Sequence, residues 1–445
     1  LYFVLPTSYV GTEGDVVQFS DAARACTAMV LWMGIWWFTE PVPIAVTALL
    51  PIVMYPILGI ATPADTLKNY ANGTIFLFLG GFLIAAGIAR WGLDRRIALV
   101  MIRIVGTKPK QIILGIMLAT TLVSAWVSNT ATAAMMLPIA LALMGVVRSV
   151  RSDQPMDQAE RNFGICLLLS IAYGASVGGV LTLIGTPPNG IINSMLDQVG
   201  IPQFGFFEFG KFGLILFAVG MLYYWAFGYR LLPEDKGGED HSFGSELKER
   251  RTAKMPYSMG IFAFVVIMMV TGALPLTTAA VLGACLVVAT RCMTMKEAFH
   301  CIDWVTIFLF AGMLSMSAAM QKSGAAALVA NAVVSNVSGP TMLMFVSCAL
   351  TMLLTNFMSN TATAALMAPL ALPIAVGGGI SPLPLMMGIC MSASACFLTP
   401  IATPPNTIVL TPGRYTFLDY MKAGWPLQII SLALCVFVIP MIWPC

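Results

Sequence analysis

The chain has 445 residues, of which 58% are hydrophobic and only 10% charged, and its mean hydropathy is +0.87. Because a soluble domain carries about 25% charged residues, this composition excludes a water-soluble protein and indicates a polytopic membrane protein. The net charge of +3 gives no reason to expect a nucleic-acid partner, and the ten cysteines and two histidines form no metal-binding motif.

Apolar stretches long enough to cross a bilayer fill most of the sequence. The first residues predict the end of a transmembrane helix that begins before Leu1 and finishes near Leu5. Ten further spans are expected at 22–39, 43–60, 74–90, 163–198, 207–230, 257–274, 276–292, 304–320, 383–411 and 424–443. The sequence therefore predicts an all-α membrane protein with about 11 transmembrane helices.

Two longer apolar segments, 110–147 and 340–376, each contain the polar triplet SNT near the middle. If the N-terminus is cytoplasmic and both segments return to the side from which they start, all but four of the 23 Lys and Arg face the cytoplasm. The exceptions are Arg24, Lys68, Lys211 and Lys322. This asymmetry favours two re-entrant hairpins and a periplasmic C-terminus.

The two halves of the chain repeat each other. SNTATAAMMLPIAL at 128–141 matches SNTATAALMAPLAL at 359–372, and LIGTPPNGII at 183–192 matches PIATPPNTIV at 400–409. The halves enter the membrane from opposite sides, as in secondary transporters with inverted repeats. We expect residues 1–21 to hold the partial helix and an outer loop, 22–230 the first repeat, 231–256 a cytoplasmic linker, and 257–445 the second repeat.

The repeated motifs are typical of broken helices. Ser and Thr are good helix N-caps, and a helix N-terminus carries free N–H groups that attract carboxylates. Proline pairs at 187–188 and 404–405 interrupt the partner spans. Irregular backbone at membrane depth must be buried in protein or line a wet cavity, so four helix ends are expected to converge on one site.

Charged residues are missing from the sequence around both motifs: no Lys, Arg, Asp or Glu lies near them. The absence of an intramembrane acid or histidine argues against a proton relay, and an anion bound there needs another counter-charge. Sodium held by hydroxyl, amide and carbonyl oxygens is the simplest hypothesis. Ser124 and Thr355, one helical turn before each SNT, fit it, although simple helix packing explains them equally well. Gly178–Gly179 is interpreted as a close helix contact.

The twin SNT motifs and twin prolyl breaks resemble the divalent anion/sodium symporters, the dicarboxylate and citrate carriers, over nearly the whole chain. The resemblance implies a homodimer in which a transport domain moves as an elevator against a scaffold. It implies a first sodium site at Ser124, Ser128, Asn129 and the Gly185 carbonyl, and a second at Thr355, Ser359, Asn360 and the Ala402 carbonyl. It implies substrate contacts from Asn129, Thr130, Thr186, Pro187, Asn360, Thr361, Thr403 and Pro404.

The sequence thus predicts an inner-membrane importer of a C4-dicarboxylate (succinate, malate or fumarate) coupled to sodium. A sodium-independent dicarboxylate antiporter and a carrier for citrate or sulfate remain open. An anion channel has no need of mobile inverted hairpins. A membrane enzyme is disfavoured because the spans hold no nucleophile–base pair, catalytic acid or histidine cluster.

Overall fold

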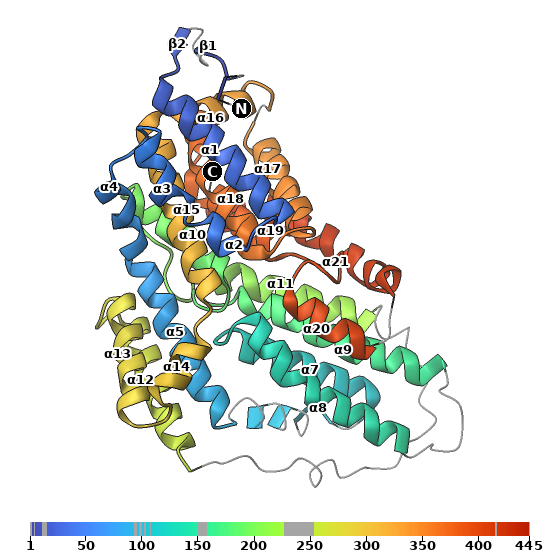
Figure 1. The fold of residues 1–445 in the computed structure, drawn as a ribbon. Coiled ribbons are helices and arrows are strands. Elements are labelled where there is room, and N and C mark those ends of the chain that lie inside the picture. The colour runs from blue at the N-terminus through green and yellow to red at the C-terminus, as the bar shows by residue number, and fades with distance from the viewer. Residues whose placement is uncertain are drawn as a thin grey trace.

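The computed structural model describes residues 2–3, 5–10, 16–92, 96–97, 100–101, 104–106, 108–149, 158–226, 253–337, 339–413 and 416–444. Within these residues the chain is helical apart from one short hairpin of strands β1 (Ser8–Val10) and β2 (Val16–Gln18), which pair antiparallel with Tyr9 opposite Val17. Figure 1 shows an elongated assembly of packed helices, with the strand hairpin at one end.

The helices up to residue 226 are α1 (Asp21–Thr39), α2 (Ile44–Thr47), α3 (Leu50–Ile57), α4 (Pro63–Lys68), the 3₁₀ turn η1 (Asn69–Ala71), α5 (Gly73–Arg90), α7 (Pro109–Ser124), α8 (Asn129–Ser149), α9 (Gln158–Gly179), α10 (Pro187–Gln198) and α11 (Glu208–Ala226). The helices from residue 255 onward are α12 (Met255–Thr271), α13 (Leu276–Ala289), α14 (Met295–Cys301), α15 (Trp304–Ser323), α16 (Ala325–Val334), α17 (Pro340–Thr355), α18 (Asn360–Gly377), α19 (Pro382–Ser394), α20 (Pro404–Gly413), α21 (Phe417–Phe437) and α22 (Ile439–Ile442).

The start of the chain differs from the expected helix end near Leu5. The described residues there form turns and then strand β1, and the backbone N–H of Phe19 donates to Thr7 O at 2.8 Å. Pro6 has no backbone N–H and cannot donate within a helix. The segment therefore closes on itself as a strand hairpin, and the expectation of a helix was wrong for the described residues.

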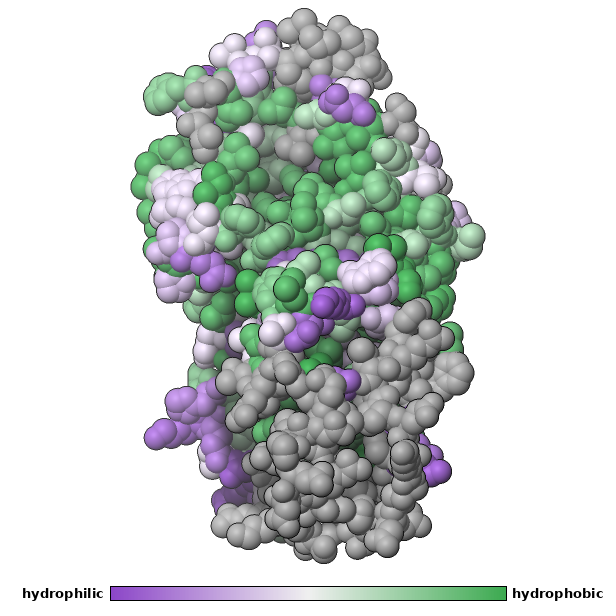
Figure 2. All heavy atoms as spheres, turned by 90° about the vertical axis from the view of Figure 1, so that its right-hand side faces the viewer, coloured by the Kyte–Doolittle hydropathy of each residue, from purple (hydrophilic) through white to green (hydrophobic). Residues whose placement is uncertain are grey.

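The surface of the molecule is that of an integral membrane protein. By length and composition, five helical stretches in the described residues can cross a bilayer: Pro63–Arg90, Asn162–Gly179, Trp304–Ser323, Asn360–Gly377 and Phe417–Ile442. Eight shorter apolar helical stretches accompany them, so a count of about 11 crossings remains a prediction. Large apolar side chains such as Ile57, Val376 and Ile429 are exposed, and Figure 2 shows hydrophobic residues over much of the upper part of one face.

Two helix pairs follow the repeated sequence motifs. α7 runs into α8 through residues 125–128, and α17 runs into α18 through residues 356–359, so each SNT lies where the second helix of a pair begins. Figure 1 shows α7 and α8 in the lower part of the view and α17 and α18 in the upper part. The expected linker at 231–256 lies almost wholly outside the described residues, and the division into two inverted repeats stays a prediction.

The two spans that carry TPPN are both interrupted. The first is divided into α9 and α10, and the second into α19 and α20. Each helix after the break packs against the other half of the chain: α10 against α18 and α19, and α20 against α8 and α9. The core of the molecule therefore lies where the breaks of the two halves interlock.

Candidate cation and anion site

The first hairpin tip is closed by its own side chains. Ser128 Oγ accepts from the backbone N–H of Ala131 at 3.4 Å, which is the N-cap interaction expected at the start of α8. Ser124 Oγ lies 2.9 Å from Asn129 Oδ1 and 2.8 Å from the carbonyl oxygen of Ala175 on α9. The tip thus brings a hydroxyl, an amide oxygen and a backbone carbonyl oxygen together.

The second hairpin tip repeats this arrangement. Ser359 Oγ accepts from the backbone N–H of Ala362 at 3.2 Å. Thr355 Oγ1 lies 3.0 Å from Asn360 Oδ1 and 2.5 Å from the carbonyl oxygen of Ala393 on α19. The amide oxygen faces the hydroxyl in both tips, so the two groups of oxygens are matched atom for atom.

Each of the two hydroxyls lies within hydrogen-bond distance of two oxygens. A hydroxyl carries one hydrogen, so Ser124 cannot donate fully to both Asn129 Oδ1 and Ala175 O, and Thr355 faces the same conflict with Asn360 Oδ1 and Ala393 O. Hydroxyl, amide and carbonyl oxygens are the ligands of hard cations, so a bound cation would relieve both conflicts.

The prolyl breaks are held open by one asparagine each. Asn189 Nδ2 donates to the carbonyl oxygens of Gly179 (3.2 Å) and Thr182 (2.7 Å). Asn406 Nδ2 donates in the same way to Cys396 (3.0 Å) and Thr399 (3.1 Å). These bonds satisfy carbonyl groups that a continuous helix would have paired, which is why the chain tolerates the break in an apolar setting.

Threonine hydroxyls join each break to the hairpin tip of the same half. Thr182 Oγ1 donates to the carbonyl oxygen of Ala125, directly after α7. Thr399 Oγ1 donates to the carbonyl oxygen of Asn356, directly after α17, at 2.5 Å. The break and the tip of each half therefore form one hydrogen-bonded unit.

The sequence-predicted site residues differ in how deeply they lie. Seven are buried: Ser124, Gly185, Thr186, Thr355, Asn360, Ala402 and Thr403. Five are partly exposed: Ser128, Asn129, Pro187, Ser359 and Thr361. Two are exposed: Thr130 and Pro404. The hydrogen bonds directly unite Ser124 with Asn129 and Thr355 with Asn360.

Gly185 packs against Gly179, and Gly179 in turn packs against the Asn129 amide of the first oxygen group. A Cβ on Gly185 would lie 2.5 Å from Gly179 O, and a Cβ on Gly179 would lie 2.3 Å from Asn129 Oδ1. Gly178 makes the close helix contact interpreted from the sequence, because its Cβ would lie 2.4 Å from Thr121 O. Gly179 has a different role, since the space beside it is filled by the Asn129 amide.

Sequence reasoning missed the residues that connect the two halves. Cys396 Sγ lies 4.0 Å from Ser176 Oγ on α9 and 3.7 Å from Thr403 Oγ1. Cys390 Sγ donates to Asn189 Oδ1 at 3.0 Å. Cysteines in apolar runs carry no sequence signal beyond burial. Cys396 could have been found only by aligning the two breaks, which places it opposite Gly179.

A cavity of about 620 Å³ opens beside the first tip. Its walls are α5, the tip and start of α8, and the segment 293–301 that includes α14. Ser128 of the SNT motif lines it, and so does Arg90 at the end of α5. The sequence places no basic residue near the motifs, but the fold brings Arg90 into the same cavity as Ser128.

Arg90 is paired with Glu297 of α14 across the two halves of the chain. Hydrogen bonds from the Thr294 backbone and hydroxyl, and then from Arg90, lower the pKa of Glu297 from 4.5 to about 2. A carboxyl whose pKa falls on folding stabilises the fold above its unfolded pKa, and this contribution is lost only as pH drops through about 2. The Cys301 thiol also interacts electrostatically with both Glu297 and Arg90.

We therefore expect the Arg90–Glu297 pair to stay intact from about pH 5 to pH 8. The ratio of Cys301 modification rates by an anionic and by a cationic thiol reagent should be constant over this range, because the thiolate fraction cancels in the ratio. A ratio that changes steeply between pH 5 and pH 7 in a His300→Gln background, which removes the imidazole next to Cys301, would contradict the assignment of Glu297 as a permanent carboxylate.

One family profile matches nearly the whole chain. The profile of the family described as citrate transporter, CitMHS, matches residues 34–379 and again 338–444. The chain belongs to the citrate transporter family. This family is of the divalent anion/sodium symporter type, so the resemblance carried by the SNT and TPPN motifs is confirmed, and the protein is a membrane transporter.

Proteins with similar sequences include two staphylococcal transporters. The sodium-dependent dicarboxylate transporter SdcS of Staphylococcus saprophyticus is 29% identical over 96% of this chain and 87% of its own length. SdcS of Staphylococcus aureus strain MRSA252 is 31% identical over 94% of this chain and 85% of its own length. The likeness therefore extends across both halves of the chain.

Solved structures share the fold of this citrate transporter family member at low sequence identity. The YdaH transporter of Alcanivorax borkumensis superposes with a TM-score of 0.58 at 13% identity, covering 94% of this chain and 98% of that one. MtrF of Neisseria gonorrhoeae, from a class of antimetabolite efflux pumps, gives 0.55 at 14% identity, covering 98% and 96%. Both have transporter folds.

Proposed function

We propose that this protein imports a C4-dicarboxylate such as succinate, malate or fumarate together with sodium. The observation that carries the proposal is the pair of matched oxygen groups at Ser124–Asn129 and Thr355–Asn360, each of which brings a hydroxyl, an amide oxygen and a backbone carbonyl oxygen together. The dicarboxylate and sodium specified in the name of SdcS, 29–31% identical over nearly the whole chain, support the same cargo and ion.

In this mechanism sodium binds first. Each ion takes a hydroxyl oxygen and an Asn oxygen at one tip, and the Gly185 and Ala402 carbonyls extend the two sites. Sodium then fixes the two tips so that the N-terminal N–H groups of α8 and α18 face the space between them. The positive ends of these helices and the two ions provide the counter-charge for a dianion in a site without an adjacent basic residue.

The dianion is held between Asn129 and Thr130 on one side and Asn360 and Thr361 on the other. Thr186–Pro187 and Thr403–Pro404 close the pocket at the two breaks. The loaded domain then slides past the scaffold of a homodimer in the inner membrane, and the cargo leaves on the cytoplasmic side. Two sodium ions with a dianion are neutral, so electrogenic transport requires a third cation, which gains about 2.3 kcal/mol per 100 mV.

The test is uptake of radiolabelled succinate into proteoliposomes that hold the purified protein. With an inward sodium gradient we expect saturable accumulation, and with potassium in place of sodium we expect uptake to fall to the level of protein-free liposomes. The reason is that without the cation the oxygen groups at both tips repel a dianion instead of attracting it.

Two other outcomes would contradict sodium-coupled dicarboxylate import. Uptake without sodium that appears only when the liposomes contain dicarboxylate would identify an antiporter. Sodium-driven uptake of citrate with none of succinate would identify a tricarboxylate carrier, which the description of the family as citrate transporters makes the next cargo to test.

A further inference from the structure

Arg90 and Glu297 line the cavity that Ser128 also lines, and the partly exposed edge that these two side chains form is called the mouth. The rest of the lining is almost wholly apolar, and Arg90 is its one basic residue within the described part of the chain. We propose that Arg90 is a transit site for the dianion on the cytoplasmic side, and that Glu297 competes with the dianion for Arg90 and so releases it. This inference rests on the proposed function and deepens it.

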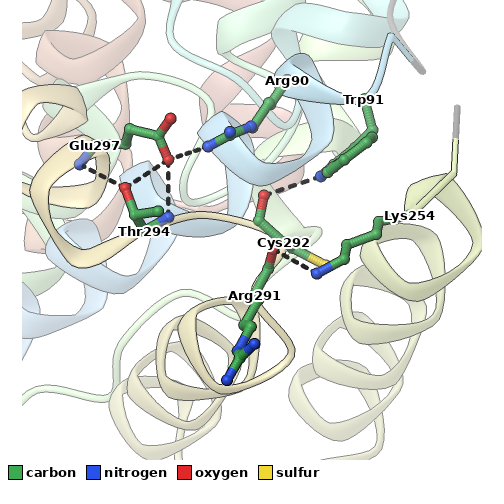
Figure 3. Close-up of polar contacts among 7 residues, drawn as sticks. All are labelled: Arg90, Trp91, Lys254, Arg291, Cys292, Thr294 and Glu297. Atoms are coloured by element: carbon green, nitrogen blue, oxygen red, sulfur yellow. Dashed lines mark hydrogen bonds and ion pairs between the residues drawn. The ribbon is translucent and has the colours of Figure 1, made fainter. Parts of the chain in front are cut away.

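The frame around the mouth is fixed by hydrogen bonds. Trp91 Nε1 donates to Cys292 O at 3.0 Å, and Lys254 Nζ donates to Arg291 O at 2.8 Å, so the turn between α13 and α14 is held from two sides. Figure 3 shows Arg90 reaching across to Glu297 while the Arg291 side chain points away from the pair. The Arg90 side chain is therefore the part that can move without disturbing the turn.

Glu297 can lose Arg90 at low cost. Its Oε2 atom accepts from the Thr294 backbone N–H at 2.8 Å and from the Thr294 hydroxyl at 2.7 Å, in addition to Arg90. The bond from the Thr294 N–H belongs to the capping box of α14, whose other bond runs from the Glu297 N–H to the Thr294 hydroxyl at 3.4 Å, and both Thr294 donors stay in place when Arg90 leaves. Both partners are also partly open to solvent, with side-chain exposures of 38% for Arg90 and 44% for Glu297.

An anion that crosses this cavity needs a cation along its way. Between apolar walls a carboxylate loses hydration, which is costly unless a charged donor replaces the water. A guanidinium binds carboxylates through paired N–H donors, and exchanging the Glu297 carboxylate for a substrate carboxylate leaves the chemistry of the pair unchanged. Glu297 then re-forms its ion pair with Arg90, which displaces the substrate carboxylate and lets the dianion leave.

The two partners should therefore have opposite effects on one measured quantity, the KM for succinate at the cytoplasmic face. Inside-out and right-side-out membrane vesicles give this KM and its outer counterpart separately. Arg90→Gln should raise the cytoplasmic KM about tenfold, equivalent to about 1.4 kcal/mol, and leave the outer KM within about twofold. Glu297→Gln should lower the cytoplasmic KM, since glutamine preserves the capping box but no longer competes as a charge.

A purely structural ion pair gives a different pattern, because breaking it from either side has the same consequence. Equal changes of the cytoplasmic KM in Arg90→Gln and Glu297→Gln, or changes confined to the outer face, would overturn the proposal. Arg291→Gln is the matched control, since it removes one positive charge from the same end of the protein. Its KM values should stay within about twofold of wild type, because its side chain points away from the pair and is not among the residues that line the cavity.

A second measurement does not depend on transport. Cys301 lines the same cavity and is exposed, so its modification rates by an anionic and a cationic methanethiosulfonate report the local potential. Arg90→Gln should lower the anionic-to-cationic rate ratio severalfold, and Glu297→Gln should raise it. Cys301→Ser supplies the background from other thiols, including the exposed Cys285 on α13.

The KM values and the Cys301 rate ratios together distinguish a failure of the proposed transport function from a failure of the role proposed for Arg90. Wild-type vesicles without sodium-driven succinate uptake would contradict the proposed function, and the Cys301 ratios would then decide alone whether Arg90 sets the potential of the cavity. Normal wild-type uptake with Cys301 ratios unchanged in both variants would overturn the role of Arg90 and leave the proposed function standing.

Discussion

Replacing Asn129 or Asn360 with alanine is expected to lower sodium-driven succinate uptake by about 100-fold or more, because losing even an outer-shell partner of a bound metal costs about 10–100-fold. Each asparagine supplies the amide oxygen that faces the hydroxyl of Ser124 or Thr355 at 2.9 and 3.0 Å. Alanine removes a proposed sodium ligand and a proposed substrate contact together. Initial uptake rates in proteoliposomes, corrected for the amount of reconstituted protein, measure the effect.

The fold should survive these substitutions. The hairpin tips keep their serine caps and the bonds from Thr182 and Thr399, so both variants should elute as wild type in size-exclusion chromatography. Asn336→Ala is the control, because this exposed asparagine at the end of α16 bonds only within its own turn and lies outside the site. Wild-type uptake by Asn129→Ala or Asn360→Ala would refute the site assignment.

Aspartate at position 360 separates the two roles of the asparagine. It has nearly the same shape and keeps an oxygen beside Thr355, so sodium binding should persist or strengthen. The added negative charge lies where a dianion must bind, and like charges at close range repel. We therefore expect Asn360→Asp to bind sodium while failing to transport succinate, whereas a purely structural asparagine would lose both properties equally.

The parts of this site that were predictable from sequence are those set by local chemistry. A serine before a run of alanines caps a helix wherever it occurs, and a proline pair interrupts one. Ser359 caps α18 and Pro187 opens α10 for these reasons. The repetition of SNT and TPPN in both halves raised these local signals from ordinary helix features to a paired site.

The parts that were not predictable depend on tertiary packing. The carbonyl oxygens of Ala175 and Ala393 complete the oxygen groups, but a backbone oxygen leaves no mark in the sequence. Arg90 is separated from Ser128 along the chain by the whole of α7, and only the fold brings both to one cavity. The start of the chain was also predicted wrongly, because the residues before Pro6 have the apolar composition of a helix, whereas those that the structure describes form turns ahead of strand β1.

Gly179 is small enough for close helix packing and also leaves space for the Asn129 amide. Beside Gly178 it has the small size needed for close helix packing, which is the interpretation that the sequence favoured. In the structure a Cβ at this position would lie 2.3 Å from Asn129 Oδ1, far inside van der Waals contact. The glycine therefore leaves the space into which a proposed sodium ligand points.

Gly179→Ala is accordingly expected to abolish the sodium activation of uptake at low sodium and to raise the half-saturating sodium concentration about tenfold or more, or about 1.4 kcal/mol. The clash is with the end of a flexible side chain, so Asn129 turns aside and the fold persists. Sodium titration of succinate uptake measures the shift, and a thermal melt of the purified protein checks the fold.

The second half supplies the matched control, because the position equivalent to Gly179 is Cys396. Cys396→Ser keeps a hydrogen-bonding group beside Ser176 and Thr403 and introduces no clash, so its half-saturating sodium concentration should stay within about threefold of wild type, or about 0.7 kcal/mol. The combined variant Gly179→Ala with Asn129→Ala should be no worse than Asn129→Ala alone, since both changes remove the same oxygen from the same place. Additive losses in the combined variant would mean that Gly179 acts through helix packing and not through Asn129.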